Sequence, residues 1–154
     1  MNSRTADGLG TQLRRLLEMM DGDVEAMYRD KDPVYSPRFT PVMKALSDSH
    51  PLSIKEIAGR SSISHSAASQ TISIMAKKGL VTLAPDIDKR SRLVSLSVQG
   101  KKLLPWLNER WSTVNKAADA LDQELDFPLS ELLAQAIDAL EKRSFAERIQ
   151  EQDS

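Results

Sequence analysis

Two signals for the start of a helix follow each other closely in the middle of the chain, and they limit the fold more than any other feature. Ser53 is followed three residues later by Glu56, which is the pattern of a capping box. Ser64 can cap a second helix by accepting a hydrogen bond from a backbone N–H of its first turn. The first helix therefore covers only about 53–60, and the second covers about 65–78.

A hairpin with a polar loop follows the second short helix. Branched side chains over 80–84 predict a strand, the polar stretch 85–91 predicts the loop, and 92–97 predicts the returning strand. Two short helices joined by a tight turn and followed by a hairpin have the order of a winged helix-turn-helix. We therefore predict a mainly α fold with a small wing of two or three β-strands.

An apolar stripe predicts a long helix over 7–29. Its members recur at spacings of three and four, which places them on one face of a helix. Two prolines within 30–37 indicate a loop. Thr40 is then expected to cap a short helix that has Pro41 in its first turn. The stripe consists of Leu9, Leu13, Leu16, Met20, Val24 and Met27.

A heptad seam predicts a second long helix after the hairpin, and such a seam needs a partner helix within the chain or in a second copy. Ser97 is expected to cap this helix, and Pro105 to bend it or delay its start. Pro128 is expected to start a last helix, followed by a loose polar tail from about Gln150. The seam consists of Leu104, Leu107, Trp111, Val114, Ala118, Leu121 and Leu125.

Charge is unevenly distributed along the chain, whose net charge is −1. Residues 53–102 hold nine lysines and arginines against three acids, whereas 103–154 hold five against eleven. No aspartate or glutamate occurs within 57–85, which includes the second short helix. A basic segment of this kind indicates a polyanionic partner such as nucleic acid, because acids would repel its phosphates.

The composition argues against several other classes of protein. The absence of cysteine excludes disulfides and thiolate metal sites, and two histidines are too few for a multi-histidine zinc site. Neither a glycine-rich phosphate loop nor a G-x-S-x-G motif is present. Because no apolar run is long enough for a signal peptide or a membrane span, we expect a soluble cytoplasmic protein without a metal or cofactor.

The second short helix is expected to expose small hydrogen-bonding groups, which suit a helix that reads base edges in the DNA major groove. At the hairpin tip Arg90 can enter the minor groove, and Asp88 can hold its guanidinium by a charge-assisted hydrogen bond. The candidate DNA-binding residues are therefore Ser64, His65, Ser66, Ser69, Gln70, Ser73, Lys77, Lys89, Arg90 and Arg92.

Other interpretations of these residues stay open. Gln70 and the serines of the second short helix could also form an ordinary solvated face. Asp88 and Arg90 could form an ordinary surface ion pair. A winged helix that binds a protein would expose an apolar face instead, and a DNA-binding protein of low sequence specificity would carry the same charges. An enzyme is disfavoured because His65 and the adjacent serines do not face each other on a helix.

The hairpin sequence resembles the wing signature of the MarR family of bacterial regulators, D-x-R-S-R-x-V-x-L-T-x-x-G. The match runs from Asp88 to Gly100, with Ser97 in place of the usual threonine. The stretch from Ser64 to Val81 is similar to the recognition helix of that family and its entry into the first wing strand. The resemblance covers about 38–105, and the outer helices match in position and length rather than in motif.

This resemblance implies a homodimeric, sequence-specific transcriptional regulator, expected to act as a repressor on a pseudo-palindromic operator. It implies an N-terminal dimerisation helix and loop at 1–37, a DNA-binding domain at 38–100 and C-terminal dimerisation helices at 101–154. Many family members carry a basic residue where this chain has Gln70, so its operator is expected to differ from theirs.

The resemblance also implies that a small aromatic ligand releases the DNA. Side chains that are aromatic or methionine could line a pocket for such a ligand, although sets of this kind at helical spacing more often form a core. The candidates are Tyr28, Tyr35, Phe39, Met43, Trp106 and Trp111.

Overall fold

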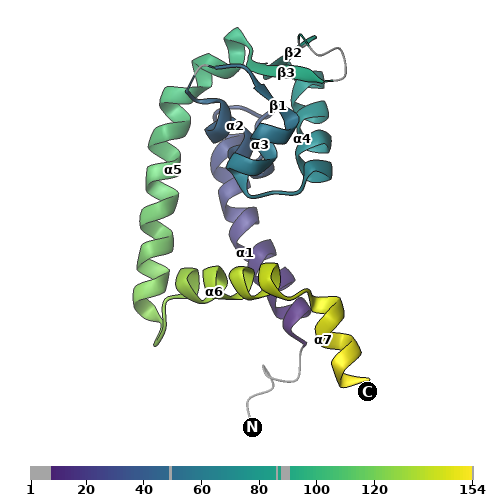
Figure 1. The fold of residues 1–154 in the computed structure, drawn as a ribbon. Coiled ribbons are helices and arrows are strands. Elements are labelled where there is room, and N and C mark those ends of the chain that lie inside the picture. Colours follow the sequence, from purple (N-terminus) through teal and green to yellow (C-terminus); the bar gives the residue numbers. More distant parts are fainter. Residues whose placement is uncertain (1–7, 49, 86, 88–90, 154) are drawn as a thin grey trace. The chain divides into compact units, whose positions relative to one another are not determined.

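The computed structural model describes residues 8–48, 50–85, 87 and 91–153 of the chain (Figure 1). These residues fall into two compact units, which are Met1–Trp106 and Leu107–Ser154. None of the helices in this described part combines membrane-spanning length with a sufficiently apolar sequence.

The first unit is a winged helix-turn-helix preceded by a long helix. Its three strands form an antiparallel sheet in the order β1-β3-β2, in which Leu52 pairs with Val94 and Val81 pairs with Leu96. The prediction of a mainly α fold with a small wing is confirmed, with three strands. The elements are α1 (Leu9–Arg29), η2 (Pro37–Phe39), α2 (Thr40–Leu46), β1 (Leu52–Ser53), α3 (Ile54–Ser61), α4 (His65–Lys77), β2 (Val81–Pro85), β3 (Arg92–Leu96) and the start of α5 (Val98–Glu124).

Helices α2, α3 and α4 lie side by side next to this sheet and enclose the core of the first unit (Figure 1). Each helix contributes apolar side chains from one face, as the spacing of three and four requires. The sheet closes the core with β-strand residues that point to the same side. The fully buried side chains include Val42, Met43, Leu46, Ile57, Ala68, Ile72, Met75, Leu80 and Val94.

Both predicted helix starts in the middle of the chain are confirmed. The Glu56 backbone N–H donates to Ser53 Oγ at 3.2 Å, and the Ser53 backbone N–H donates to Glu56 Oε2 at 2.8 Å, which completes the capping box of α3. The Ala67 backbone N–H donates to Ser64 Oγ at 3.1 Å at the start of α4. Local side chains therefore determine where the two helices of the helix-turn-helix begin.

The expected cap at Thr40 was wrong, and of the two alternatives given for Pro105 the delayed start of the helix was wrong. Thr40 lies within α2, whose N-cap is Phe39, because the short helix η2 leads directly into it. The Thr40 hydroxyl instead shares a hydrogen bond of 2.9 Å with the Tyr35 hydroxyl. Pro105 lies inside α5 and does not delay its start, since α5 already begins at Val98. The cap expected at Ser97 is present, and Ser97 Oγ accepts from the Gly100 backbone N–H at 3.0 Å.

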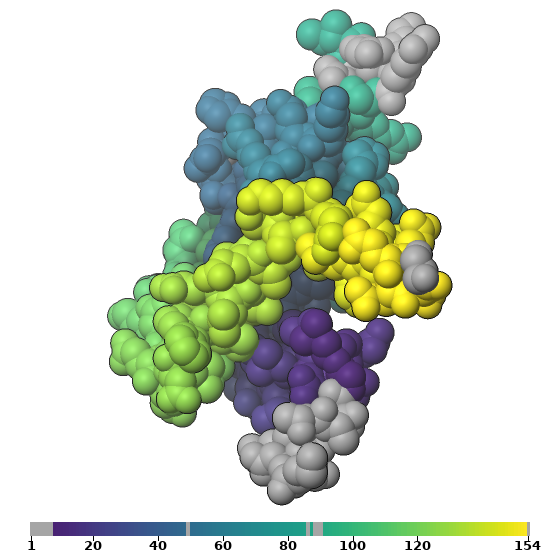
Figure 2. All heavy atoms as spheres, turned by 60° about the horizontal axis from the view of Figure 1, so that its bottom comes forward, coloured from purple at the N-terminus to yellow at the C-terminus, as the bar shows by residue number. Residues whose placement is uncertain are grey.

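The second unit consists of the remainder of α5 together with α6 (Leu129–Lys142) and α7 (Phe145–Gln152). Pro128 is the N-cap of α6 and makes no side-chain cap. Asp122, near the end of α5, provides the side-chain cap of α6 instead. Its Oδ1 accepts from the backbone N–H groups of Leu129 at 2.8 Å and Ser130 at 3.2 Å. The surfaces of α6 and α7 lie open on the face shown in Figure 2, in yellow-green and yellow.

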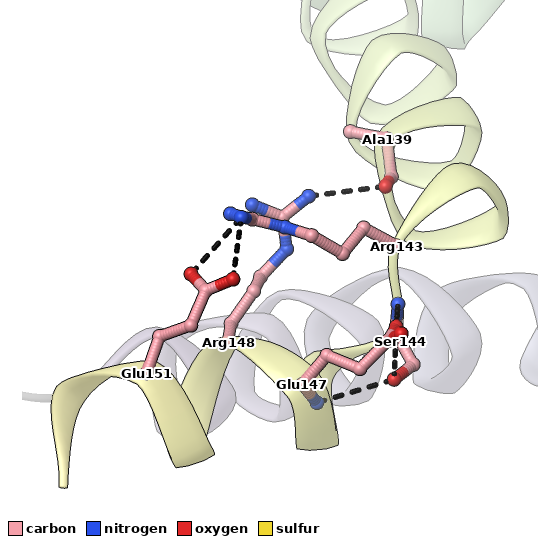
Figure 3. A network of polar contacts seen from close by, with 6 residues as sticks. All are labelled: Ala139, Arg143, Ser144, Glu147, Arg148 and Glu151. Carbon is pink, nitrogen blue, oxygen red and sulfur yellow. Dashed lines mark hydrogen bonds and ion pairs between the residues drawn. The ribbon is translucent and has the colours of Figure 1, made fainter. Parts of the chain in front are cut away.

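The expectation of a loose tail from Gln150 was wrong, because α7 continues to Gln152. Ser144 and Glu147 form a second capping box, and the hydroxyl and backbone N–H of Ser144 lower the pKa of Glu147 (Figure 3). Arg143 holds both carboxylate oxygens of Glu151 at 3.0 Å. These contacts fix the corner between α6 and α7.

Candidate nucleic-acid interface

The inner face of α4 is fully packed, and this fixes which side chains the helix presents to solvent. Ala68, Ile72 and Met75 are at most 1% exposed, and Thr71 is 4% exposed. Rotation of α4 about its axis would expose these side chains, at a cost of about 1.5–3 kcal/mol for each large apolar one. The orientation of the outer face is therefore determined by the core.

The outer face of α4 carries the polar side chains that the sequence singled out. Ser66, Gln70, Ser73 and Lys77 are exposed and recur at spacings of three and four, so that they follow one face of the helix. Ser69 beside them is half-buried, and Ser64 and His65 are exposed at the N-terminal end. The structure thus brings the predicted residues of α4 together on one polar surface.

The N-terminal end of α4 is suited to a negatively charged partner. Its first turn contains no acidic residue, and Ser64 Oγ accepts only from the Ala67 backbone N–H in that turn. The N–H groups of His65 and Ser66 have no acceptor within the helix and carry the positive end of its dipole. Phosphate oxygens are suitable acceptors for such groups.

The two lysines at the C-terminal end of α4 have different surroundings. Lys78 Nζ donates to the Val34 backbone oxygen at 3.3 Å and lies 5.9 Å from the centre of the Phe39 ring. It therefore attaches the end of α4 to the segment between α1 and α2. Lys77 lies on the outer face instead and is exposed. Side chains at adjacent positions on a helix point in directions about 100° apart, which explains why the two lysines have different surroundings.

The described residues include both strands that flank the wing loop, but only part of the loop itself. Arg92 is exposed in β3 and pairs with Pro85 of β2, and Ile87 in the loop between them is fully exposed. Sequence reasoning did not single out Ile87, although apolar side chains can insert between base steps of the minor groove. Asp88, Lys89 and Arg90, on which the predicted minor-groove contact depends, lie outside the described residues.

Most of the proposed ligand-pocket residues pack against one another in the first unit. The ring of Tyr28 meets the rings of Tyr35 and Trp106 edge-on, with centroids 4.7 and 5.7 Å apart, and Tyr35 meets Phe39 at 5.9 Å. Met43 is also fully buried. These rings form an aromatic cluster that joins α1, α5 and the start of α2. Trp111 belongs to the second unit, so its place in a common pocket stays a prediction.

An open cavity of about 410 Å³ lies between α2 and the end of α3, and sequence reasoning missed it. Lys44 and Arg60 line it together with Ser61 and Asp48. Because Lys44 and Arg60 come from different helices, no local pattern in the sequence shows that they share one cavity. The only signal available was that Arg60 lies within the acid-free stretch 57–85.

This fold occurs in several solved transcriptional regulators. The chain is similar to the M. tuberculosis regulator MOSR, solved with DNA, at a TM-score of 0.70 and 16% identity over 90% of this chain and 100% of that one. It is similar to BpsR from Bordetella bronchiseptica at a TM-score of 0.61 and 18% identity, over 91% and 95% of the two chains. A MarR transcriptional regulator from Methanosarcina mazei Go1 gives a TM-score of 0.56 and 18% identity, over 88% and 93%.

No family model matches the sequence, and no curated protein matches it. The structural likeness nevertheless extends over nearly the whole chain and includes the helices on both sides of the winged helix. The chain therefore has the winged helix-turn-helix fold of the MarR-type regulators, as the wing sequence predicted.

Proposed function

We propose that this chain is a sequence-specific, double-stranded DNA-binding transcriptional regulator that acts in the cytoplasm and is not an enzyme. Helix α4 occupies the major groove as the recognition helix, and the wing between β2 and β3 contacts the minor groove. The outer face of α4 carries this proposal, because it presents hydroxyl, amide and ammonium groups on a helix whose inner face is fixed by the core.

The types of side chain on this face support base reading. Gln70 can pair with N6 and N7 of adenine, and the hydroxyls of Ser66 and Ser73 can donate or accept at any base edge. No carboxylate of 57–85 would repel the phosphates that border the groove. A winged helix that binds protein through this face would instead expose apolar side chains there.

A homodimer on a pseudo-palindromic operator is the assembly that we propose. In the first unit α1 exposes Leu9, Leu17 and Met19, and in the second unit α6 exposes Leu132 and Ile137. Monomers in water rarely leave such sets of large apolar side chains uncovered. A second copy covers them, and two-fold symmetry then presents two α4 helices to half-sites about one DNA turn apart.

We further propose that the chain is a repressor released by a small aromatic ligand. The DNA binding of BpsR is regulated by 6-hydroxynicotinic acid, which is such a molecule. Insertion of a ring between Tyr28 and Tyr35 would move the segment between α1 and α2, to which Lys78 attaches the end of α4. The candidate contacts remain Tyr28, Tyr35, Phe39, Met43, Trp106 and Trp111.

Selection of genomic fragments by the purified protein at about physiological salt tests the function. Enrichment of a short inverted repeat supports a site-specific dimeric regulator and identifies its operator. Enrichment of DNA without a common motif would instead assign a DNA-binding protein of low sequence specificity. Failure to retain any duplex at low salt would refute the proposal, since the phosphate contacts are strongest there.

A further inference from the structure

The cavity between α2 and α3 holds two cations on its walls. Arg60 is exposed near the end of α3, and Lys44 is exposed on α2. The Ser61 hydroxyl donates to the Pro41 backbone oxygen at 3.1 Å and holds the two helices together at this point. Arg60 takes part in none of the ion pairs formed among the described residues, although Asp48 lines the same cavity.

The position of Arg60 in the chain places it next to the N-terminal end of the recognition helix. Only the turn over 61–63 separates it from Ser64, the N-cap of α4. Helix α4 has 13 residues, and a helix of that length extends about 20 Å. The major groove is about 12 Å wide, so a helix of this length reaches the sugar-phosphate strands that border the groove.

The cations around α4 are distributed between its two ends. Arg60, Lys77 and Lys78 are the only basic residues of the acid-free stretch 57–85, apart from His65. Lys78 is attached to Val34 and Phe39, which leaves Lys77 on the outer face at the C-terminal end. Among the lysines and arginines of 57–85, Arg60 is then the one that precedes the N-terminal end of α4.

We propose that Arg60, assisted by Lys44, binds a DNA backbone phosphate at the N-terminal edge of the recognition helix. This inference rests on the proposed function and extends its interface from α4 to the cavity between α2 and α3. The first helix of a helix-turn-helix crosses the DNA backbone, and α3, which carries Arg60 in its last turn, is the first helix here. A guanidinium binds phosphate through two parallel hydrogen bonds, whereas Lys44 supplies a second charge.

Binding of a mixed-sequence DNA duplex, measured by fluorescence anisotropy over a range of KCl concentrations, tests the contact without knowledge of the operator. Each lost phosphate contact lowers the slope of log Kd against log salt by about 0.9. A variant that matches the wild type at 1 M salt therefore binds about eightfold more weakly than the wild type at 0.1 M salt. Arg60→Gln is expected to show this loss for each protomer bound. Arg60→Lys keeps the charge and is expected to retain most of the slope.

Two further variants separate a contact from a general effect of charge. Lys55→Gln removes the same charge from the same helix, but Lys55 lies roughly 140° around the axis from Arg60 and is expected to leave the slope unchanged. Asp48→Asn removes the acid that lines the cavity and is expected to tighten binding. Circular dichroism and thermal unfolding of each variant establish that the fold is retained.

The outcomes distinguish this inference from the proposed function. If the wild-type protein binds the duplex and Arg60→Gln keeps its full slope, or Lys55→Gln loses as much, the phosphate contact at Arg60 is refuted while DNA binding stands. If inorganic phosphate raises the Tm of the wild type but not of Arg60→Gln, and the DNA slope is unchanged, the cavity binds free phosphate instead. If the wild type binds no duplex, both proposals fail.

Discussion

Gly100 lies so close to Leu80 that a Cβ on residue 100 would be 2.3 Å from the Leu80 carbonyl oxygen. The same oxygen accepts a hydrogen bond from the Ser97 backbone N–H at 3.0 Å, and the Ser97 hydroxyl donates to the Gly79 carbonyl at 2.6 Å. The first turn of α5 therefore packs directly on the junction between α4 and β2. This close approach requires the glycine that ends the wing signature.

Gly100→Ala is expected to lower the free energy of unfolding by about 1–3 kcal/mol, because the backbone of α5 must move away from Leu80 to accommodate the methyl group. The movement would also lengthen the two hydrogen bonds that Ser97 donates to Leu80 and Gly79. Urea denaturation measures the change.

Gly59→Ala is the matched control for this prediction. Gly59 is exposed in α3, and a Cβ there meets nothing within 4 Å. Because alanine loses less backbone entropy than glycine on forming a helix, this variant is expected to be more stable by about 0.5–1 kcal/mol. Equal destabilisation by both variants would show that the contact between Gly100 and Leu80 is not responsible.

The helix starts could be predicted from the sequence because their causes are local. The caps at Ser53, Ser64 and Ser97 depend on atoms within three residues of the serine. The same signal is present at Ser144, where Glu147 completes the capping box, so α7 was predictable although it was not predicted. Thr40 was misassigned because the preceding turn η2 depends on the packing of Phe39, which is not a local pattern.

The contacts that distinguish similar side chains could not be predicted. Lys77 and Lys78 look equivalent in the sequence, and only the fold brings Lys78 to Val34, 44 positions earlier. Arg60 and Lys44 likewise meet at one cavity because α2 packs on α3. The sequence therefore predicts the exposed polar face of α4, but it does not predict which cations outside that face make contacts within the fold.

Gln70→Ala is expected to weaken binding to the selected operator by about 1–3 kcal/mol and to relax the preference at one position of each half-site. The amide of Gln70 is exposed in the middle of the outer face, so its removal leaves the core unchanged. Selection with the variant protein measures the preference. If the selected motif stays the same at every position, Gln70 does not read a base.

Substitutions of the two lysines at the end of α4 are expected to change different properties, DNA binding for Lys77 and stability for Lys78. Lys77→Met should lower the salt slope of DNA binding by about 0.9 for each protomer, since it removes the phosphate contact proposed for Lys77. Lys78→Met should leave that slope unchanged and lower the free energy of unfolding by about 0.5–1 kcal/mol, because it loses its contact with the Phe39 ring. Anisotropy titrations and urea denaturation of both variants test this division, and identical behaviour of the two would contradict it.

The apolar face of α6 is expected to be needed for dimerisation. Ile137→Glu places a charge among exposed apolar side chains of α6, and burial of that charge against a second copy would be unfavourable. The expected result is a shift from dimer to monomer in analytical ultracentrifugation. Gln135→Glu adds the same charge elsewhere on α6 and is expected to leave the dimer intact. A dimer of undiminished stability in Ile137→Glu would exclude this face from the interface.

Asp122 is expected to make the stability of the second unit depend on pH. The Ser130 hydroxyl lowers the pKa of Asp122 most, the backbone N–H groups of Ser130 and Leu129 lower it further, and partial desolvation opposes them. Because the pKa is lower in the folded state, the stabilisation is present above the unfolded pKa and is lost as the pH falls through the folded pKa. Asp122→Ala should therefore be less stable than wild type at neutral pH, and the difference should shrink in acid.

Asp119→Ala controls for the gain of alanine and the loss of an acid on the same helix. Asp119 is exposed and accepts none of the hydrogen bonds that begin α6. Urea denaturation followed by helical circular dichroism, at neutral pH and at a pH below the carboxyl range, gives the comparison for both variants. A stability difference for Asp122→Ala that is the same at both pH values would mean that its charge does not support α6. A difference that disappears in acid, and is absent from Asp119→Ala, assigns the effect to the ionised carboxylate, which replaces the cap that Pro128 does not provide.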